Sequence, residues 1–148
     1  MYDALKHLSH SVGQNTYHLV WRPKWNWDPF KFDKVRRLCE AAIRNAAYRS
    51  GMTIIALEVM PDHVHCFADL PPSLSVAAAL QRLKGFSAYI LFKNHPWLRR
   101  YFRTGHFWSP GKFFRSVGTV TADAVTHYIN ESNRGDRTQT FLTRYPAL

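Results

Sequence analysis

The sequence lacks the features that mark a membrane or secreted protein. None of its apolar runs approaches the ~20 residues that a membrane-spanning helix needs, and the segment from Met1 to His7 has no apolar core of a signal peptide. It has only two cysteines, Cys39 and Cys66, and they do not form a CxxC motif. These absences predict a cytoplasmic protein without membrane association, in which both thiols are buried and reduced rather than joined in a disulfide.

Acidic residues are also scarce. Ten Asp and Glu stand against 20 Lys and Arg, which gives a formal net charge of +10 and a pI near 10. Such a surplus favours a polyanionic partner, either nucleic acid or an anionic membrane. Nucleic acid fits better, because the aromatic residues are scattered through the chain instead of gathering opposite a basic face on one helix.

Low-complexity tracts and internal repeats are absent as well, and 46% of the residues are hydrophobic. This composition argues against an intrinsically disordered chain. A length of 148 residues corresponds to one ordinary domain rather than two. We therefore expect a single domain over residues 1–148, with residues 136–148, which show no strong periodicity, as a candidate tail.

Residue patterning predicts seven elements. Runs rich in apolar, aromatic and β-branched residues indicate strands at 14–21, 52–60, 63–70 and 107–117, the last interrupted at 109–111. Helical spacing of apolar residues indicates helices at 32–49, from a Ser73 or Ser75 cap to a stop at 94–96, and from Thr121 to about Asn130. This order is that of an α+β, ferredoxin-like split βαβ sandwich, with an antiparallel sheet, helices on one face and an extra C-terminal helix.

Two histidines lie two residues apart in the run from Pro61 to Cys66 (PDHVHC). Alternate residues of a strand point to the same face, so His63 and His65 would share one face while Val64 and Cys66 point to the core. One interpretation is half of a metal site, which requires at least a third ligand. The other is a pair of surface or hydrogen-bonded histidines in a chain that contains eight. The triplet alone leaves both open.

A tyrosine on the last predicted helix, Tyr128, has two interpretations as well. Ala124, Val125 and Ile129 are its neighbours at helical spacing, which is typical of a residue at the edge of a core stripe. The alternative is a phenolate nucleophile. Because an ordinary phenol has a pKa near ~10, this role requires a Lewis acid or cation nearby.

Several segments, taken together and in order, resemble the single-tyrosine transposases of the insertion sequence 200/605 family. They run from about Asn15 to Asn133 and comprise Tyr17–Lys24 (YHLVWRPK), Met60–His65 (MPDHVH), Phe107–Ser109 (FWS), Val117–Val120 (VGTV) and Tyr128–Ile129. Each piece by itself is unspecific, whereas the ordered set is specific.

The resemblance implies a His-hydrophobic-His endonuclease domain and a DNA transposase. By this analogy His63 and His65 bind a divalent cation, Mg²⁺ or Mn²⁺, that polarises the scissile phosphate of single-stranded DNA. Tyr128 attacks the phosphorus and forms a 5′-phosphotyrosine intermediate, and another 3′-OH reverses the attack to rejoin the strand. The resemblance also implies a homodimer that recognises hairpins at the ends of an insertion sequence. Related alternatives are a domesticated repeat-associated nuclease, a replication-initiator nuclease and a non-catalytic nucleic-acid-binding module.

The third metal ligand departs from the family pattern. The family commonly places a Gln four residues after the tyrosine, and Ser132 occupies that position here. Ser132 lies only ~40° around the helix from Tyr128, but its hydroxyl is a shorter and weaker ligand than an amide. Asn133 carries an amide but lies ~140° away on a regular helix. Both residues, the more remote Glu131 and a water molecule remain open as the third ligand.

Basic and aromatic residues complete the predicted DNA contacts. Phosphate contacts are expected from six residues, Lys84, Arg99, Arg100, Arg103, Lys112 and Arg115, because backbone neutralisation supplies most sequence-independent affinity. Four aromatic residues are candidates either for stacking on unpaired bases or for core packing, namely Phe30, Trp97, Phe102 and Trp108. His106 and His127 receive no metal assignment, because nothing pairs them by spacing.

Overall fold

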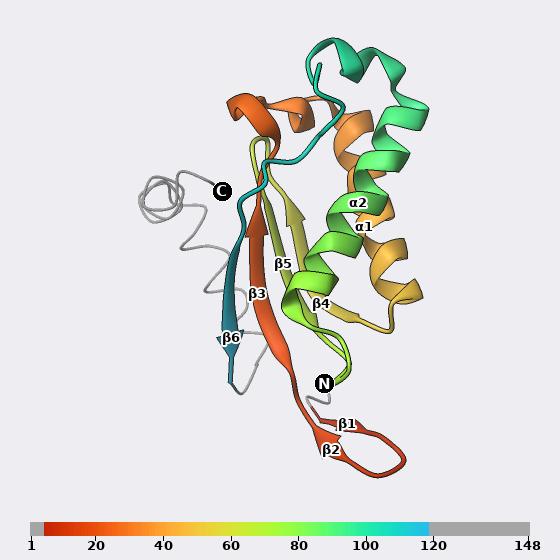
Figure 1. Ribbon diagram of the computed structural model, residues 1–148, viewed down its shortest axis with the longest axis vertical. Helices are drawn as coiled ribbons and strands as arrows, with labels where there is room; N and C mark the ends of the chain where they lie inside the picture. The colour runs from red at the N-terminus through yellow and green to blue at the C-terminus, as the bar shows by residue number, and fades with distance from the viewer. Residues whose placement is uncertain (1–4, 119–148) are drawn as a thin grey trace.

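A four-stranded antiparallel sheet forms the centre of the molecule in the computed structural model, which describes residues 5–118 (Figure 1). The strands are β3 (Thr16–Trp21), β4 (Thr53–Val59), β5 (Val64–Asp69) and β6 (Phe113–Val117), arranged in the order β4-β5-β3-β6. Every neighbouring pair is antiparallel. This is the predicted split βαβ arrangement. The predicted C-terminal helix, with Tyr128, Ser132 and Asn133, and the segment 136–148 lie outside the described residues.

Two long helices cover one face of this sheet (Figure 1). Helix α1 (Asp33–Arg49) connects β3 to β4, and helix α2 (Val76–Asn94) connects β5 to β6. Of the two predicted caps for α2, Ser75 is the one used, since its Oγ accepts a hydrogen bond from the Ala78 amide at 3.1 Å. The sequence therefore sets the start of α2 through a side-chain cap.

Helix α1 ends where the sequence places Gly51. This glycine has a φ of +71°, which only glycine adopts without strain. The Met52 amide donates to Ala47 O at 2.9 Å and the Gly51 amide donates to Tyr48 O at 3.2 Å. This pair of bonds is a Schellman motif, and the buried Met52 side chain closes it against the core. Strand β4 begins directly after this turn, at Thr53.

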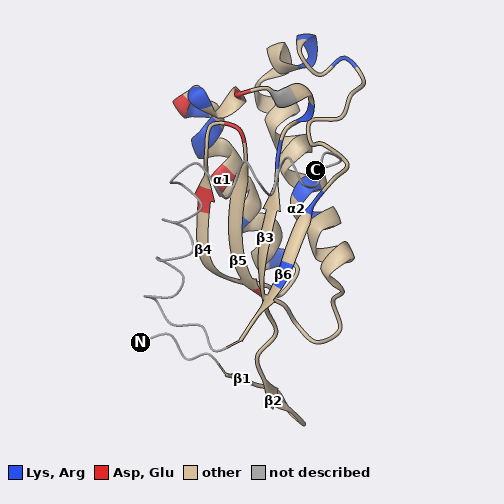
Figure 2. Ribbon diagram, turned by 90° about the vertical axis from the view of Figure 1, so that its left-hand side faces the viewer, with Lys and Arg blue, Asp and Glu red and all other residues tan. Residues whose placement is uncertain are grey.

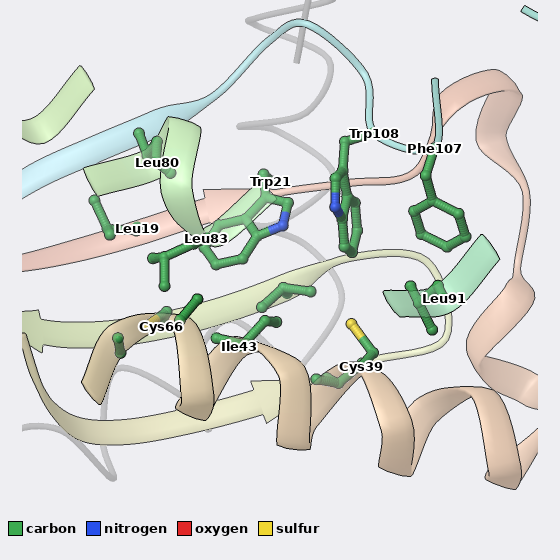
Figure 3. Close-up of a cluster of buried hydrophobic side chains, with 14 of the residues drawn as sticks. Leu19, Trp21, Cys39, Ile43, Cys66, Leu80, Leu83, Leu91, Phe107 and Trp108 are labelled. Atoms are coloured by element: carbon green, nitrogen blue, oxygen red, sulfur yellow. The ribbon is translucent and has the colours of Figure 1, made fainter. Parts of the chain in front are cut away.

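The main core lies between the helices and the sheet (Figure 3). Leu19 and Trp21 of β3 point into it together with Val64 and Cys66 of β5, and all four are fully buried. As predicted, both cysteines are free and buried, Cys39 on α1 and Cys66 on β5. Burial raises the pKa of the Cys66 thiol to about 12. Both sulfur atoms therefore act as packing groups in this structure.

A hydrogen-bonded tryptophan ties α2 to the segment that leads into β6. The indole Nε1 of Trp108 donates to Ser87 Oγ at 3.0 Å, and Ser87 Oγ donates in turn to Leu83 O. Trp108 also packs edge-on against Trp21 and forms an isolated β-bridge with Pro23. The predicted interruption of the last strand is confirmed, because pairing breaks after Trp108 and resumes at Phe113.

Several short elements surround the sandwich. Three 3₁₀ turns, η1 (Lys24–Asn26), η2 (Pro29–Lys31) and η3 (Pro96–Arg100), lie at the end of the molecule where β4 turns into β5 (Figure 1). A small hairpin, β1 (Lys6–His7) with β2 (Val12–Gly13), was not predicted, because two-residue strands carry no periodicity. In the described part of the chain, no helix combines the length and apolar character needed to cross a membrane.

Candidate functional site

The face of the sheet opposite the helices carries a row of buried imidazoles. Because side chains alternate along a strand, His18 of β3 and His65 of β5 point away from Leu19 and Cys66. The register pairs His18 with Phe67 and Val20 with His65, so these residues form adjacent rows on one surface. We call the side chains of Thr16, His18, His63, His65, Phe67 and Asp69 the histidine face; all are buried.

Three imidazoles and a carboxylate form a continuous chain of contacts. Asp62 Oδ1 lies 2.6 Å from His63 Nδ1, and His63 Nε2 lies 2.9 Å from His65 Nε2. The other nitrogen of His65, Nδ1, lies 3.0 Å from His18 Nε2. His63 and His65 are only 6% and 2% exposed, which rules out a solvent-exposed pair. The Nε2 atoms of His63 and His65 therefore face each other, and their Nδ1 atoms are held by Asp62 and His18.

The geometry of this histidine pair suits a shared metal ion. With metal–nitrogen bonds of about 2.0–2.1 Å and bond angles of about 90–109°, two imidazole ligands have nitrogens about 2.8–3.4 Å apart. The separation of 2.9 Å between the two Nε2 atoms falls in this range. Within residues 5–118 no three His, Cys, Asp or Glu side chains converge to hold a metal. The pair could therefore supply two ligands to a metal ion, and no third protein ligand adjoins it among residues 5–118.

Burial keeps two of these rings neutral. It lowers the pKa of His18 to about 4, with a smaller contribution from the cation of Arg115, which pairs with His18 across β3 and β6. Burial also lowers the pKa of His65 to about 3, and the neighbouring His63 and His18 add to this effect. The hydrogen bond from His63 lowers the pKa of the Asp62 carboxyl. Neutral imidazoles are the form that can ligate a metal ion, and both rings keep this form at neutral pH.

Two members of the chain were not predicted as site residues. His18 makes the hydrogen bond that orients His65, and Asp62 does the same for His63. Ligating histidines commonly have such partners on their second nitrogen, which fix the tautomer and the ring orientation. The alternation of the strand TYHLVW already places His18 opposite Leu19 and Trp21. Its proximity to His65 depends on the pairing of β3 with β5, which the sequence alone does not reveal.

Three of the six predicted phosphate contacts line one hollow beside α2. Its volume is about 700 Å³, its wall contains Lys84, Arg99 and Lys112, and none of its lining residues within 5–118 is acidic. The Lys84 ammonium donates to Ser109 O at 2.8 Å and to Gly111 O at 3.4 Å. Burial, with a contribution from Lys112, lowers the pKa of Lys84 to about 8. Lys84 therefore braces the backbone before β6 in addition to any role toward DNA.

The other three predicted phosphate contacts are exposed and lie apart from this hollow. Arg100 belongs to η3 and Arg103 follows it, whereas Arg115 lies on β6 across from His18. The four aromatic candidates divide in the structure. Phe30, Phe102 and Trp108 are 3%, 1% and 6% exposed and pack in the core, while Trp97 is 38% exposed. Core packing is thus the observed role of three of them.

The family model described as "Transposase IS200 like" matches residues 11–132 of this chain. The transposase for insertion sequence element IS200 from Salmonella typhimurium is 30% identical over 135 residues, which is 89% of this chain and 88% of the relative. The ISDra2 transposase TnpA of Deinococcus radiodurans is 30% identical over 122 residues, covering 82% of this chain and 86% of the relative.

Solved structures show the same fold. A crystal structure of a candidate transposase from Deinococcus radiodurans superposes with a TM-score of 0.70 at 29% identity, covering 85% of this chain and 96% of the other. A REP-associated tyrosine transposase bound to a REP hairpin superposes with a TM-score of 0.57 at 16% identity, covering 88% and 74%. With the family match spanning both the histidine pair and Tyr128, this chain belongs to the family of IS200-like transposases.

Proposed function

We propose that this protein cleaves and rejoins single-stranded DNA at hairpin-bearing insertion-sequence ends, in the cytoplasm, with Tyr128 as nucleophile and Mg²⁺ or Mn²⁺ as cofactor. The observation that carries the proposal is the buried pair of facing Nε2 atoms on His63 and His65, 2.9 Å apart. Membership of the IS200-like transposases supplies the reaction class. The positive charge of the chain suits a DNA substrate.

The proposed reaction conserves the phosphodiester bond energy. The Tyr128 oxygen forms a bond to phosphorus while the bond from phosphorus to O3′ breaks, so the phenol loses a proton to solvent and the departing O3′ gains one. A bound divalent cation supplies charge neutralisation at the scissile phosphate. His63 and His65 would hold that cation through Nε2, and the contacts of their Nδ1 atoms with His18 and Asp62 orient the two rings. Attack by another 3′-OH on the phosphotyrosine restores a continuous strand.

A covalent-adduct assay tests this proposal. The full-length protein is incubated with a 5′- or 3′-labelled single-stranded hairpin oligonucleotide and Mn²⁺ or Mg²⁺, and adducts are separated by denaturing electrophoresis. We expect an adduct that carries the 5′-phosphate side and that disappears in Tyr128→Phe, in His65→Ala and in EDTA. Tyr48→Phe is the matched control, because Tyr48 is 85% exposed on α1. An adduct that survives Tyr128→Phe contradicts the proposal.

The recognised DNA is proposed to contain a hairpin. The support is one structural relative, which was solved as a complex with a REP hairpin. Competition between a hairpin from the DNA that flanks the gene and a scrambled strand of equal length tests this element. Equal affinity for both contradicts hairpin recognition. If the best hairpins lie at dispersed repeats rather than at element ends, the repeat-associated alternative replaces the insertion-sequence assignment.

The third metal ligand and the homodimer remain proposals as well. Ser132 and Asn133 are the candidate ligands on the tyrosine segment, and Ser132→Ala and Asn133→Ala distinguish them by their loss of Mn²⁺ affinity. Mixing inactive His65→Ala with inactive Tyr128→Phe tests the assembly. Recovery of adduct formation requires that one subunit provide the tyrosine to the histidines of its partner, whereas no recovery favours a site built from one chain.

A further inference from the structure

Four aromatic rings form a continuous surface at the end of the molecule where β4 turns into β5. Trp27 and Tyr101 have ring centroids 3.9 Å apart, Tyr101 and Trp97 are 6.1 Å apart, and Trp97 and Phe32 are 5.4 Å apart. We call Trp27, Phe32, Trp97 and Tyr101 the aromatic surface. Phe32, Trp97 and Tyr101 are 44%, 38% and 41% exposed. Large rings in contact with each other therefore face solvent side by side.

The exposure of these rings is not a sign of a loose segment. Trp97 and Tyr101 alternate with Leu98 and Phe102, which are both only 1% exposed. The segment that begins with η3 therefore buries Leu98 and Phe102 and leaves Trp97 and Tyr101 at the surface. Phe102 packs against Phe107 and Phe92 in the core. The outer rings are thus held by an inner pair, and a ligand that stacks on them meets a preorganised surface.

The charge around these rings is positive. Lys31 Nζ lies 5.3 Å from the Phe32 ring centroid, and Arg99 and Arg100 are exposed on the same turn as Trp97. Segments 22–33 and 95–106 together contain six Lys and Arg and two Asp. One of the two, Asp33, is already paired with Arg36 and Arg37. Figure 2 shows Lys and Arg at both corners of this end of the molecule.

The aromatic surface and the histidine pair occupy the same end of the fold. The last residue of β3, Trp21, pairs with Val64, the residue between the two histidines. Pro23 bridges to Trp108 only two residues later. The chain therefore leaves the sheet beside His63 and runs directly into η1 and η2, which precede Phe32, while η3 lies at the same end (Figure 1). The rings and the histidine pair therefore lie at the same end of the fold.

We propose that the aromatic surface is a stacking site for unpaired bases of the single DNA strand on which the histidine pair acts, an inference that rests on the proposed function. Only bases released from a duplex present a face to such rings, whereas paired bases present edges and phosphates. The exposed arginines beside the rings contact the phosphates of the same strand. An uncharged membrane or an apolar protein surface would not account for cations around the rings. The ligand is therefore an unpaired polynucleotide segment.

Equilibrium binding in EDTA tests the stacking site without cleavage. The full-length protein is titrated into a fluorescein-labelled unpaired oligonucleotide and, separately, into a duplex of the same charge. In Trp97→Ala and Tyr101→Ala we expect affinity for the unpaired strand to fall about 10-fold each, within the range per stacked base, and affinity for the duplex to change less than about 2-fold. Trp97→Phe, which keeps a ring, restores most of the affinity, while Trp97→Leu does not.

Controls separate stacking from folding and from charge. Tyr48→Ala removes a more exposed ring from α1, outside the aromatic surface, and leaves both affinities unchanged. 2-Aminopurine in the oligonucleotide reports stacking directly, and its quenching disappears in Trp97→Leu. Equal losses on unpaired and duplex DNA, or no loss on either, overturn the inference. A shift in oligomeric state with unchanged DNA affinity overturns it as well, because the surface would then bind a second copy of the chain.

The two proposals fail separately. Absence of a covalent adduct with intact, ring-dependent binding removes the cleavage function and leaves the stacking site. Adduct formation by Trp97→Leu at wild-type DNA affinity removes the stacking site and leaves the cleavage function.

Discussion

The two faces of strand β5 are equally buried but differ in chemistry. On the helix side, Val64 and Cys66 are 0% exposed and belong to the apolar core. On the other side, His65 and Phe67 of the same strand are 2% and 0% exposed, and His65 contacts His18 and His63. Consecutive residues of one strand therefore contact the apolar core and the imidazoles in turn. Burial alone does not identify a core-packing residue in this fold.

A cavity-forming substitution in the core between the sheet and the helices should have the largest effect on stability. Leu19 is fully buried between the sheet and the helices, so Leu19→Ala leaves a cavity and lowers the free energy of unfolding by about 2–5 kcal/mol. Urea denaturation measures this loss. Adduct formation per folded molecule should stay at the wild-type rate, because Leu19 does not contact the imidazoles. A specific loss of activity at full stability would contradict the division between the two faces.

Lowering the pH should destabilise the folded protein through His18 and His65 of the histidine face. His18 and His65 have pKa values of about 4 and about 3 in the folded protein, both below the unfolded value of 6.5. The unfolded chain therefore binds protons first as the pH falls. The contribution of the two neutral rings to the free energy of unfolding is fully present above about pH 6.5. It decreases as the pH falls toward 4, by roughly 3 kcal/mol for His18 alone.

Urea denaturation of the metal-free protein at pH values from 4 to 8 measures this loss. His18→Gln removes one titrating group. The number of protons taken up on unfolding, which the slope of unfolding free energy against pH reports, should fall by about one in that window. Replacement of the exposed His10 by Gln is the matched control and should leave the slope unchanged. A wild-type slope in His18→Gln would show that His18 is not buried as a neutral ring.

A smaller effect, on metal affinity, is expected from substitution of His18, which contacts the proposed ligand His65. His18→Ala removes the partner of His65 Nδ1, and loss of such partners weakens metal affinity about 10–100-fold. Isothermal titration with Mn²⁺ measures the change. His18→Gln retains an acceptor and should recover part of the affinity, whereas His10→Ala should have no effect. Unchanged Mn²⁺ affinity in His18→Ala would mean that His65 is oriented by the sheet alone.

The smallest effect is expected for the chemical reactivity of Cys66, the residue after His65. Cys66 adjoins His65 in sequence but faces the helices, and burial raises its pKa to about 12. We expect no reaction of either cysteine with a thiol reagent in the folded protein and reaction of both in urea. Rapid labelling of Cys66 under native conditions would show that the strand does not keep the two faces apart.

Much of this fold was predictable because its signals are local. The alternation around His63 correctly placed Val64 and Cys66 in the core, and helical spacing with a serine cap located α2. What could not be predicted depends on contacts between distant segments. The approach of His18 to His65 requires the β3–β5 register, and Trp97 and Phe102 differ in exposure although both are aromatic residues in one basic segment. Sequence composition does not distinguish such neighbours.

The alternating pattern of β3 and β5 also affects how reliably the chain finds its native pairing. A slip of either strand by one residue would reverse its faces, carrying imidazoles into the apolar layer and Cys66 or Leu19 out of it. Both consequences oppose the slipped pairing, because a buried imidazole without a partner is costly and an exposed apolar side chain loses its burial. The imidazoles of β3 and β5 thus also disfavour pairing of these strands in the wrong register.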